Sequence, residues 1–442
     1  MKHSRSRAKQ CALLLTALLS VSMLTACDGN PGSTPSTDSI TSESSADSTN
    51  NNDSSNQQAE STKPADSKTT TPTDGTKVTE ESSQKDNEPT ATTAKANGNN
   101  TQQNPATKPA NEQSQANANA NPSTTTDAPD DEDSTVKEIK YIYLKGSTAQ
   151  YNGSGISVTG SKITISKGGT YVISGTLDNG QIYIFTDDKK VRLQLDNCSI
   201  TNQAGSAINC QQAKKVTLET LAGTTNSLAD GGTHDTDKGT VFSEDTVVLT
   251  GEGTLNIKAN YAHGVQSDDD IVVNGGNIHI ESAKSCLHSN DGIDINGGKL
   301  YCDGGTNGIK TDGYINITGG DSTFIGGIRE EKGAVYCDGV FAVTGGSFRA
   351  IGNTCTKPNP TATTVPVIGA VFSATQPGNT QVRFTCGGTE TASFTSPRTF
   401  KYALYAGSNL SLGKEYAVTY GDSNGGTFTA NGNVTLYNVP LN

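Results

Sequence analysis

An acidic or amide residue recurs at one position of a repeated pattern, and this recurrence is the first sign of chemistry in the sequence. The pattern is an aliphatic residue, any residue, then Ser, Thr or Cys, and then the acid or amide. Its last members are Glu244, Asp268, Asn290, Asp312 and Asp338. Carboxylate and amide oxygens are ligands that Ca²⁺ prefers in proteins. If these positions are stacked, the sequence predicts a calcium site.

Further acids beside this column increase the negative charge. Two carboxylates about 5 Å apart repel by roughly 1 to 3 kcal/mol, depending on the effective dielectric. Solvent, raised pKa values or a bound cation would relieve that repulsion. Asp and Asn are also ordinary turn residues, so solvated turn acids are the alternative interpretation. The predicted donor set is Asp268, Asp269, Asp270, Asn290, Asp291, Asp312 and Asp338.

A repeat would bring these residues together. Four similar segments begin at Gly264, Cys286, Gly308 and Ala334, and a looser copy begins at Thr240. Their Gly-Gly steps are 22, 22 and 26 residues apart, at Gly275, Gly297, Gly319 and Gly345. A fixed period of this size is typical of a solenoid.

Each copy contains short segments in which aliphatic and polar residues alternate, such as Ile278-His279-Ile280 and Ile293-Asp294-Ile295. Alternation places the aliphatic side chains on one face of a strand. One copy cannot bury its apolar face alone, but stacked copies can. We therefore predict an all-β chain that forms a right-handed parallel β-helix over residues 137–354.

The chain begins with a leader. Residues 1–27 have a basic start, a short apolar core and the ending Leu-Thr-Ala-Cys, which resembles a bacterial lipoprotein signal. The resemblance implies that Cys27 is lipidated and anchors the protein to a membrane without spanning it. An ordinary secretory signal cut near Ala26 is the alternative. We expect the protein on the extracellular face of a bacterial membrane.

A polar linker and a cap flank the predicted β-helix. Residues 28–136 are rich in Ser, Thr, Asn and Pro with almost no large apolar side chain, which predicts a disordered tether. Residues 225–238 are expected to be a polar insertion before the regular repeats. Residues 355–442, with longer strands, are predicted to form a C-terminal β cap over the solenoid end. Its tyrosines are expected to pack the cap, with stacking on sugars as the alternative: Tyr402, Tyr405, Tyr416 and Tyr420.

The amino-acid composition limits the kinds of partner that the protein could bind. The net charge is −12, and no basic stripe is present to neutralise phosphates, which argues against nucleic acid as a partner. The chain has no Trp, so any stacking on sugars must use Tyr or Phe. The acidity favours cations or neutral partners.

Cysteine and histidine give weaker signals. Seven Cys follow the leader without a C-x-x-C pair, which argues against a zinc ribbon. We expect buried thiols, with Cys302 pointing inward in register with Ile280. A disulfide between Cys355 and Cys386 is an alternative open to an exported protein. The histidines His279 and His288 are expected on the outward faces of strands.

The order of motifs from residue 153 to residue 276 carries a family resemblance. These motifs are GGTYVISGTLDNGQIYI, VRLQLDNCSITN, AINCQQAKKVTL, TNSLADG, GTVFSEDTVVLTGEGTLNI and HGVQSDDDIVVNGG. The sequence resembles a family of bacterial surface carbohydrate-binding β-helix proteins first described in a cellulolytic clostridium, over roughly residues 140–355. The resemblance implies a polysaccharide-lyase-like fold, association with calcium, and binding of cellulose and acidic plant polysaccharides without established cleavage.

One departure from the family pattern concerns the metal. The family often has Asp-Gly-Ile at the start of a coil, with that Asp near the metal. The corresponding positions here are His263, Ser285 and Asn307. Part of the implied calcium chemistry is therefore missing, although the predicted donor set remains.

We expect non-catalytic polysaccharide binding, assisted by calcium. A polysaccharide lyase is one alternative, and its basic group would come from the loop that contains Arg329. A structural or adhesive stalk with a protein partner is the other. An extended polymer suits the long flat face of a solenoid.

Overall fold

The structure is a computed structural model that describes residues 138–440 except 188, 235, 237, 328, 330 and 331. The predicted leader, the lipidation of Cys27 and the linker over 28–136 lie outside the described residues. Within the described part of the chain every regular element is a strand. No helix there is long and apolar enough to cross a membrane.

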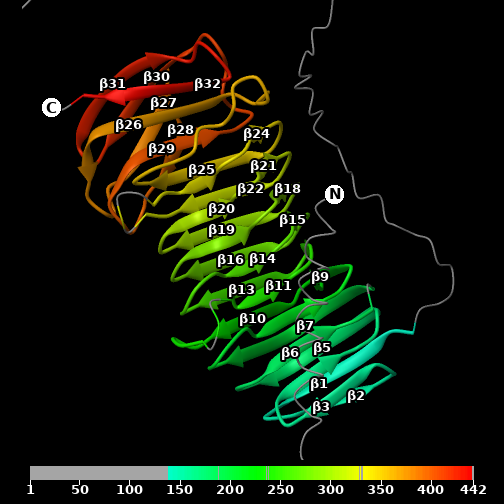
Figure 1. The fold of residues 1–442 in the computed structure, drawn as a ribbon. Helices are drawn as coiled ribbons and strands as arrows, with labels where there is room; N and C mark the ends of the chain where they lie inside the picture. The colour runs from blue at the N-terminus through cyan, green and yellow to red at the C-terminus, as the bar shows by residue number, and fades with distance from the viewer. Residues whose placement is uncertain are drawn as a thin grey trace, which may run out of the picture. The chain divides into compact units, whose positions relative to one another are not determined.

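The strands form the predicted parallel β-helix, whose coils are stacked along one axis (Figure 1). Most coils contribute three strands, one to each of three ladders. The ladder that we call sheet B contains β3 (Ile156–Thr159), β4 (Lys162–Ile165), β6 (Gln181–Phe185), β8 (Ile208–Gln212), β11 (Val241–Ser243), β14 (Val265–Ser267), β17 (Ser285–Ser289), β20 (Asn307–Thr311) and β23 (Val335–Cys337).

The other two ladders belong to sheet A. The ladder that follows sheet B in each coil contains β9 (Lys215–Thr220), β12 (Val247–Gly251), β15 (Ile271–Val273), β18 (Gly292–Ile295), β21 (Tyr314–Ile317) and β24 (Phe341–Val343). The last ladder contains β10 (Thr225–Asp230), β13 (Thr254–Ala259), β16 (Asn277–Ser282), β19 (Lys299–Gly304), β22 (Asp321–Ile325) and β25 (Ser347–Gly352). The long strands β5 (Gly169–Leu177) and β7 (Lys190–Asn202) start sheet A, and β7 pairs with both β9 and β10.

The registers confirm the predicted repeat. Val265 pairs with Leu287, Leu287 with Ile309, and Ile309 with Val335. These steps are 22, 22 and 26 residues, which match the spacing of the Gly-Gly pairs. Equivalent aliphatic side chains therefore form continuous buried columns, such as Ile271, Ile293 and Ile315, all with 0% exposure.

Antiparallel strands cover both ends of the solenoid. β1 (Lys140–Gly146) pairs with β5 and with the antiparallel β2 (Ala149–Asn152) at the first coil. At the other end β29 (Phe400–Ala406) pairs antiparallel with β25 and with β26 (Val367–Gln376). The remaining cap strands are β27 (Val382–Cys386), β28 (Thr389–Phe394), β30 (Glu415–Tyr420), β31 (Ser423–Thr429) and β32 (Val434–Val439).

The cap has its own hydrophobic core, in agreement with the prediction. Tyr405 and Tyr416 are buried in this core, and Tyr420 packs against it, while Tyr402 packs against the solenoid core. The arginine Arg398 reaches from the cap to Asp303 on β19. The cap therefore covers the edge of the last coil, which would otherwise expose unpaired strands.

The cysteines are free thiols in the described structure, and all but Cys386 are buried. Cys302 points inward in register with Ile280, as predicted. The alternative disulfide between Cys355 and Cys386 is not formed, because both are free. Burial raises the pKa of the Cys355 thiol to about 12, so this thiol stays protonated.

The expectation of a polar insertion over residues 225–238 is wrong for its first six residues, which form β10. Asn226 takes an inward position and is fully buried. Its side chain accepts a hydrogen bond from the Cys198 amide and donates to Thr224 and to the Thr254 carbonyl. These bonds offset the cost of burying an amide, so a polar residue replaces an aliphatic one in the core.

The Gly-Gly steps are required by the turn geometry. Gly298 has a φ of +83°, a backbone conformation that side chains disfavour. A Cβ added to Gly298 would lie 2.8 Å from the Gly276 carbonyl oxygen of the preceding coil. Gly298 therefore has a left-handed backbone conformation, and its turn packs directly against the turn of the preceding coil.

We predict that Gly298→Ala lowers the free energy of unfolding by about 1 to 3 kcal/mol, because alanine strains both the backbone and the coil contact. Gly232→Ala is the matched control, since a Cβ at that position meets open space. Denaturant unfolding of both variants measures the difference. Equal stability of the two variants would contradict this explanation of the repeat.

Candidate functional site

A polar groove of about 430 Å³ lies at the corner where the early coils pass from sheet A to sheet B. Amides and hydroxyls dominate its lining, and Lys162 lies at its sheet B side. The amide and hydroxyl residues are Ser161, Asn179, Gln181, Asn202, Ser206, Asn209 and Thr236. These groups donate and accept hydrogen bonds without carrying charge, as do the hydroxyl groups of a sugar.

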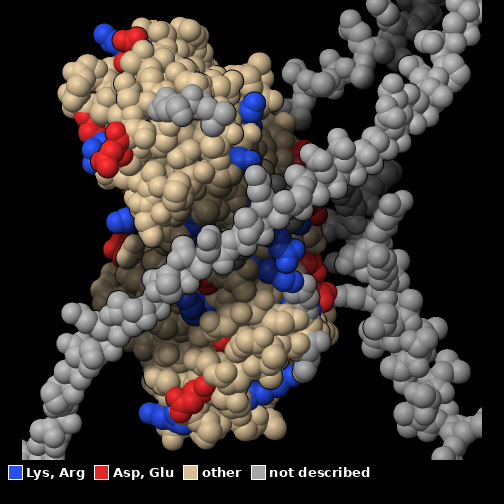
Figure 2. Space-filling view, turned by 90° about the vertical axis from the view of Figure 1, so that its left-hand side faces the viewer, with Lys and Arg blue, Asp and Glu red and all other residues tan. Residues whose placement is uncertain are grey.

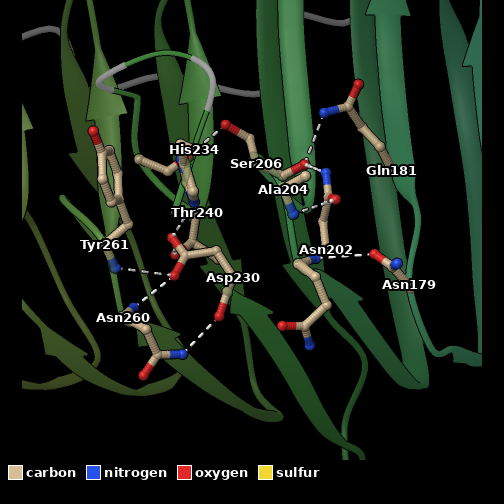
Figure 3. Close-up of polar contacts among 12 residues, drawn as sticks. Asn179, Gln181, Asn202, Ala204, Ser206, Asp230, His234, Thr240, Asn260 and Tyr261 are labelled. Atoms are coloured by element: carbon tan, nitrogen blue, oxygen red, sulfur yellow. Dashed lines mark hydrogen bonds and ion pairs between the residues drawn. The ribbon is translucent and has the colours of Figure 1, made fainter. Parts of the chain in front are cut away.

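The groove is held by hydrogen bonds between coils. Gln181 and Asn202 both donate to the Ser206 carbonyl at 2.8 Å, and Figure 3 shows their side chains directed at it. The Ser206 hydroxyl donates to the Gly239 carbonyl at 2.6 Å. Asn179 accepts a hydrogen bond from the Gln203 amide. These contacts fix the groove before any ligand arrives.

A second cluster, also visible in Figure 3, anchors the segment that brings Thr236 to the groove. The His234 side chain is fully buried, stacks on Tyr261 with centroids 4.6 Å apart, and lies 3.2 Å from the Asp230 carboxylate. Asp230 accepts hydrogen bonds from the Thr240 hydroxyl and the Asn260 amide. Burial raises the pKa of Asp230, while these donors and His234 act in the opposite direction.

The groove continues onto a row of outward side chains along sheet B. Strand registers place one residue of each coil in this row, and adjacent strands lie about 4.8 Å apart. We call the following set the sheet B row: Tyr183, Asn209, Phe242, Gln266, His288, Lys310 and Tyr336. The row combines aromatic rings, amides and basic groups on one flat face.

Lysine ammonium groups form cation–π contacts with two aromatic rings of this row. The ammonium of Lys162 lies 3.9 Å from the Tyr183 ring centroid, and that of Lys238 lies 3.7 Å from the Phe242 centroid. Phe242 is buried, whereas Tyr336 is 37% exposed. Polar groups therefore supply most of the accessible surface of the row, with Tyr183 and Tyr336 as its reachable aromatic rings.

Uncharged residues fill the positions where the family pattern often has Asp. The Ser285 amide donates to His263 Nδ1 at 3.2 Å, and Asn307 donates to the Ser285 hydroxyl at 3.3 Å. Asn307 Oδ1 then accepts from the Gly333 amide. These residues satisfy one another along the corner, which explains how the coils tolerate the departure from the pattern.

The predicted acidic column is present at the opposite end of the sheet B strands. The amides of Asp268, Asn290, Asp312 and Asp338 each donate to a carbonyl of the preceding coil. The Asn290 side chain donates to Asp268 Oδ1 at 3.5 Å. The stacking that the sequence predicts is therefore observed, while metal binding by these residues stays a prediction.

Hydroxyl groups inside the corner explain the Ser, Thr or Cys that precedes each acid. The Ser267 hydroxyl donates to the Asp245 carbonyl, and the Ser289 hydroxyl donates to the Asp269 carbonyl. The Cys337 thiol makes the equivalent contact with the Gly313 carbonyl. A small side chain with a polar hydrogen thus ties each of these three turns to the preceding one.

Asp270 has the most perturbed environment in the acidic corner. Burial raises the pKa of Asp270 to about 6, and the charges of Asp269, Asp291 and Asp294 act in the same direction. The Tyr314 phenol donates to Asp294 Oδ2 at 3.1 Å. Among the described residues, no group forms a hydrogen bond with one buried oxygen of Asp270, Oδ1. A cation would satisfy this oxygen and reduce the repulsion.

The acidic corner fits calcium in donor type, but not through acids alone. Among the described residues, no three His, Cys, Asp or Glu side chains are grouped closely enough to hold a metal ion. Calcium in this corner would therefore be held by at most two of Asp269, Asp270 and Asp291, with backbone carbonyl, amide or water oxygens as its other ligands. Other members of the predicted set have partners: Asp312 lies 3.3 Å from Lys310, and Lys238 is beside Asp268.

Arg329 lies on the loop between β22 and β23, at the corner where coils enter sheet B. The acidic column lies where coils leave sheet B. The length of a sheet B strand therefore separates Arg329 from the acids that a lyase site would combine with it.

Figure 2 shows acidic and basic side chains interspersed over the face that it presents, with a hollow between the cap and the early coils.

Comparison with known proteins agrees with this geometry. The family of carbohydrate-binding domain-containing proteins matches residues 159–380, half of the chain. The protein belongs to this family. The matched range includes the groove and the sheet B row, so both are part of the carbohydrate-binding domain.

One related protein and one solved structure are similar to this chain. A carbohydrate-binding domain-containing protein of Acetivibrio thermocellus is 32% identical over 139 residues, which are 30% of this chain and 49% of that relative. The chain thus spans about half the length of this relative. A solved structure of the polysaccharide lyase-like protein from C. thermocellum, a gadolinium derivative, is 26% identical, with a TM-score of 0.41, and covers 48% of this chain and 94% of that one.

Sequence reasoning missed the groove of this carbohydrate-binding domain. Its residues come from the early coils, where Asn179 and Ser206 lie in irregular corners rather than in the regular repeat. The cluster of Asn and Gln residues between 179 and 212 was the available signal. Only the structure shows that these residues meet at one corner.

We predict that Asp270→Asn stabilises the protein in the presence of a chelator at pH 7.5, by roughly 1 kcal/mol after allowance for solvent screening. The folded pKa of Asp270, about 6, is above the ordinary value of an aspartate. Folding therefore favours the protonated form, and the wild type loses stability as the pH rises through 6. The gain from the variant should vanish near pH 4.

Thermal unfolding of both proteins, with chelator and with calcium, measures this difference. Calcium should stabilise the wild type more than the variant. A variant that is no more stable than the wild type in chelator at pH 7.5 would contradict the described charge repulsion.

Proposed function

We propose that the sheet B face binds polysaccharide without cleaving it. The observation that carries the proposal is the continuity of the polar groove with the sheet B row. Asn209 belongs to both, because it lines the groove and follows Tyr183 in the row. Amides, hydroxyls and two accessible tyrosines along a straight face suit successive sugars of an extended polymer.

The ligand class that we propose is a cellulose-like or acidic plant glycan. The groove supplies uncharged donors and acceptors, which match sugar hydroxyls. Further along the row, His288 and Lys310 supply nitrogen donors. The same face therefore offers contacts to neutral and to acidic sugars at different coils.

We also propose that calcium assists binding from the acidic corner. Asp270 and at most one of its neighbours Asp269 and Asp291 would hold the ion, together with backbone, amide or water oxygens. When bound, the ion would neutralise the corner and offer a charge to a sugar carboxylate. The unbonded Asp270 oxygen and its raised pKa support this role.

The predicted leader and linker would place this domain outside the cell. Lipidation of Cys27 would anchor the chain to the extracellular face of the membrane, without a spanning segment. A coil of some 110 residues averages roughly 60 Å end to end, which would let the domain reach a polymer beyond the surface. Globomycin sensitivity of processing, with loss of the lipid label in Cys27→Ser, tests the anchor.

We predict that Asn209→Ala weakens polysaccharide binding by up to about tenfold, because one hydrogen-bonding side chain is lost from both parts of the face. Asn256→Ala is the matched control: Asn256 is a half-buried, outward Asn on β13 of sheet A. Pull-down on insoluble cellulose and calorimetry with soluble polygalacturonate, each with and without chelator, measure the binding.

Three outcomes would contradict the proposal. If the two substitutions had equal effects, the sheet B face would not be the binding surface. If chelator did not change the affinity, calcium would take no part in binding. Ultraviolet absorbance from unsaturated products, during incubation with polygalacturonate and calcium, would show a lyase instead of a binding protein.

A further inference from the structure

We infer that Lys162 and Asn179 make the groove a subsite for an anionic oxygen group on a bound sugar, either a carboxylate or a sulfate ester. This inference rests on the proposed function, because it assigns a ligand class to one part of the proposed binding face. It follows from the way in which backbone groups fix the amide side chains of the groove, and the subsite needs no bound metal.

A backbone contact fixes which end of the Asn179 amide a ligand can meet. The oxygen, Oδ1, accepts a hydrogen bond from the Gln203 backbone amide at 3.0 Å. A backbone N–H can only donate, so the opposite orientation of the side chain would place two donors against each other. Figure 3 shows the oxygen turned to this backbone group and the nitrogen on the other side. No described residue accepts a hydrogen bond from that nitrogen, Nδ2.

One carbonyl group fixes two further amides of the groove. The nitrogens of Gln181 and Asn202 both donate to the Ser206 carbonyl at 2.8 Å. Asn202 Oδ1 also accepts from the Ala204 amide at 3.3 Å, so both ends of this side chain have a partner. The Gln181 oxygen has no partner among the described residues, and it points away from Ser206 (Figure 3). These three amides therefore offer a ligand one donor end, that of Asn179, and one acceptor end, that of Gln181.

Lys162 adds a positive charge beside these amides. It is the register partner of Gln181 on the neighbouring strand β4, and its ammonium lies over the Tyr183 ring. Among the described residues that line the groove, Lys162 is the one charged side chain, and no described carboxylate forms an ion pair with it. A chain with a net charge of −12 thus has a groove whose described lining is positive.

An anionic oxygen group fits this combination of donors. A carboxylate or a sulfate ester offers only acceptors, so it can accept from both the Lys162 ammonium and Asn179 Nδ2. A hydroxyl of the same sugar can donate to the Gln181 oxygen. Charge-assisted hydrogen bonds are stronger than those to a neutral hydroxyl. The groove should therefore prefer an anionic sugar to its neutral counterpart.

Calorimetry on the full chain in chelator tests the subsite, because chelator removes any bridging calcium. The probes are trimers that differ only at C6: galacturonic acid, galactose and galactose 6-sulfate. A trimer is too short to reach from Lys162 on β4 to Lys310 on β20, because five strands about 4.8 Å apart lie between them. The wild type should bind an anionic trimer about tenfold more tightly than the neutral one.

Substitutions in the groove should remove this preference. Lys162→Met should lower the affinity for the anionic trimers to that for the neutral trimer, whereas Lys162→Arg should keep the preference. Asn179→Asp retains the acceptor for the Gln203 amide but replaces the donor by a charged oxygen. It should weaken binding of the anionic trimers far more than binding of the neutral one.

The matched controls make the same charge changes at outward positions of β13 on sheet A. They are Lys258→Met and Asn256→Asp, and both should keep the wild-type preference. Thermal unfolding of every variant establishes that a loss of binding is not a loss of folding.

The outcomes separate the subsite from the proposed function. A preference for either anionic trimer would support the subsite, and the more tightly bound trimer identifies the anion. Equal affinity for all the trimers, or a preference that survives both Lys162→Met and Asn179→Asp, would overturn the subsite and leave the proposed function intact. Binding of long polysaccharides without binding of any trimer would have the same consequence. Failure to bind every glycan would overturn both.

Discussion

The in-register hydrogen bonding of parallel strands from successive coils determines every other feature of this structure. It fixes which residues, 22 or 26 positions apart, lie side by side. The aliphatic columns of the core, the outward row on sheet B and the acidic corner are all consequences of one register. A shift by one residue would exchange inward and outward side chains, so the outward row and the core are specified together.

Charge along the corner is balanced within one coil in one place and between coils in another. Lys310 comes from the strand that precedes Asp312, while Lys238 comes from an earlier coil than Asp268, near which it lies. Asp270 has no such lysine among the causes of its perturbed pKa, and it lies among acids and the Tyr314 phenol. The acidic column therefore contains two environments. In one, a lysine lies beside the acid. In the other, around Asp270, acids lie together, and only this environment favours an added cation.

The regular coils could be predicted from the sequence, because their period and alternation leave little freedom. The inward position of Cys302 opposite Ile280 followed from the repeat alone. The strand β10 could not be predicted in this way, since Asn226 and Asp230 are polar and buried. Their places depend on hydrogen bonds to distant coils, such as that from the Asn260 amide to Asp230.

The same reasoning explains which part of the site was predictable. The acidic column repeats in the sequence and was expected to stack, whereas the groove joins Asn179, Ser206 and Thr236 from irregular corners. Side chains from irregular corners meet only after the early coils have folded. Membership of the carbohydrate-binding family supports our proposal that the groove and the row bind carbohydrate.

Hydrogen–deuterium exchange with and without bound polysaccharide tests the central claim most directly. The account predicts protection in peptides that contain β4, β6, β8 and the later sheet B strands, with little change in β13 and β16 on sheet A. Protection confined to sheet A or to the cap would contradict it.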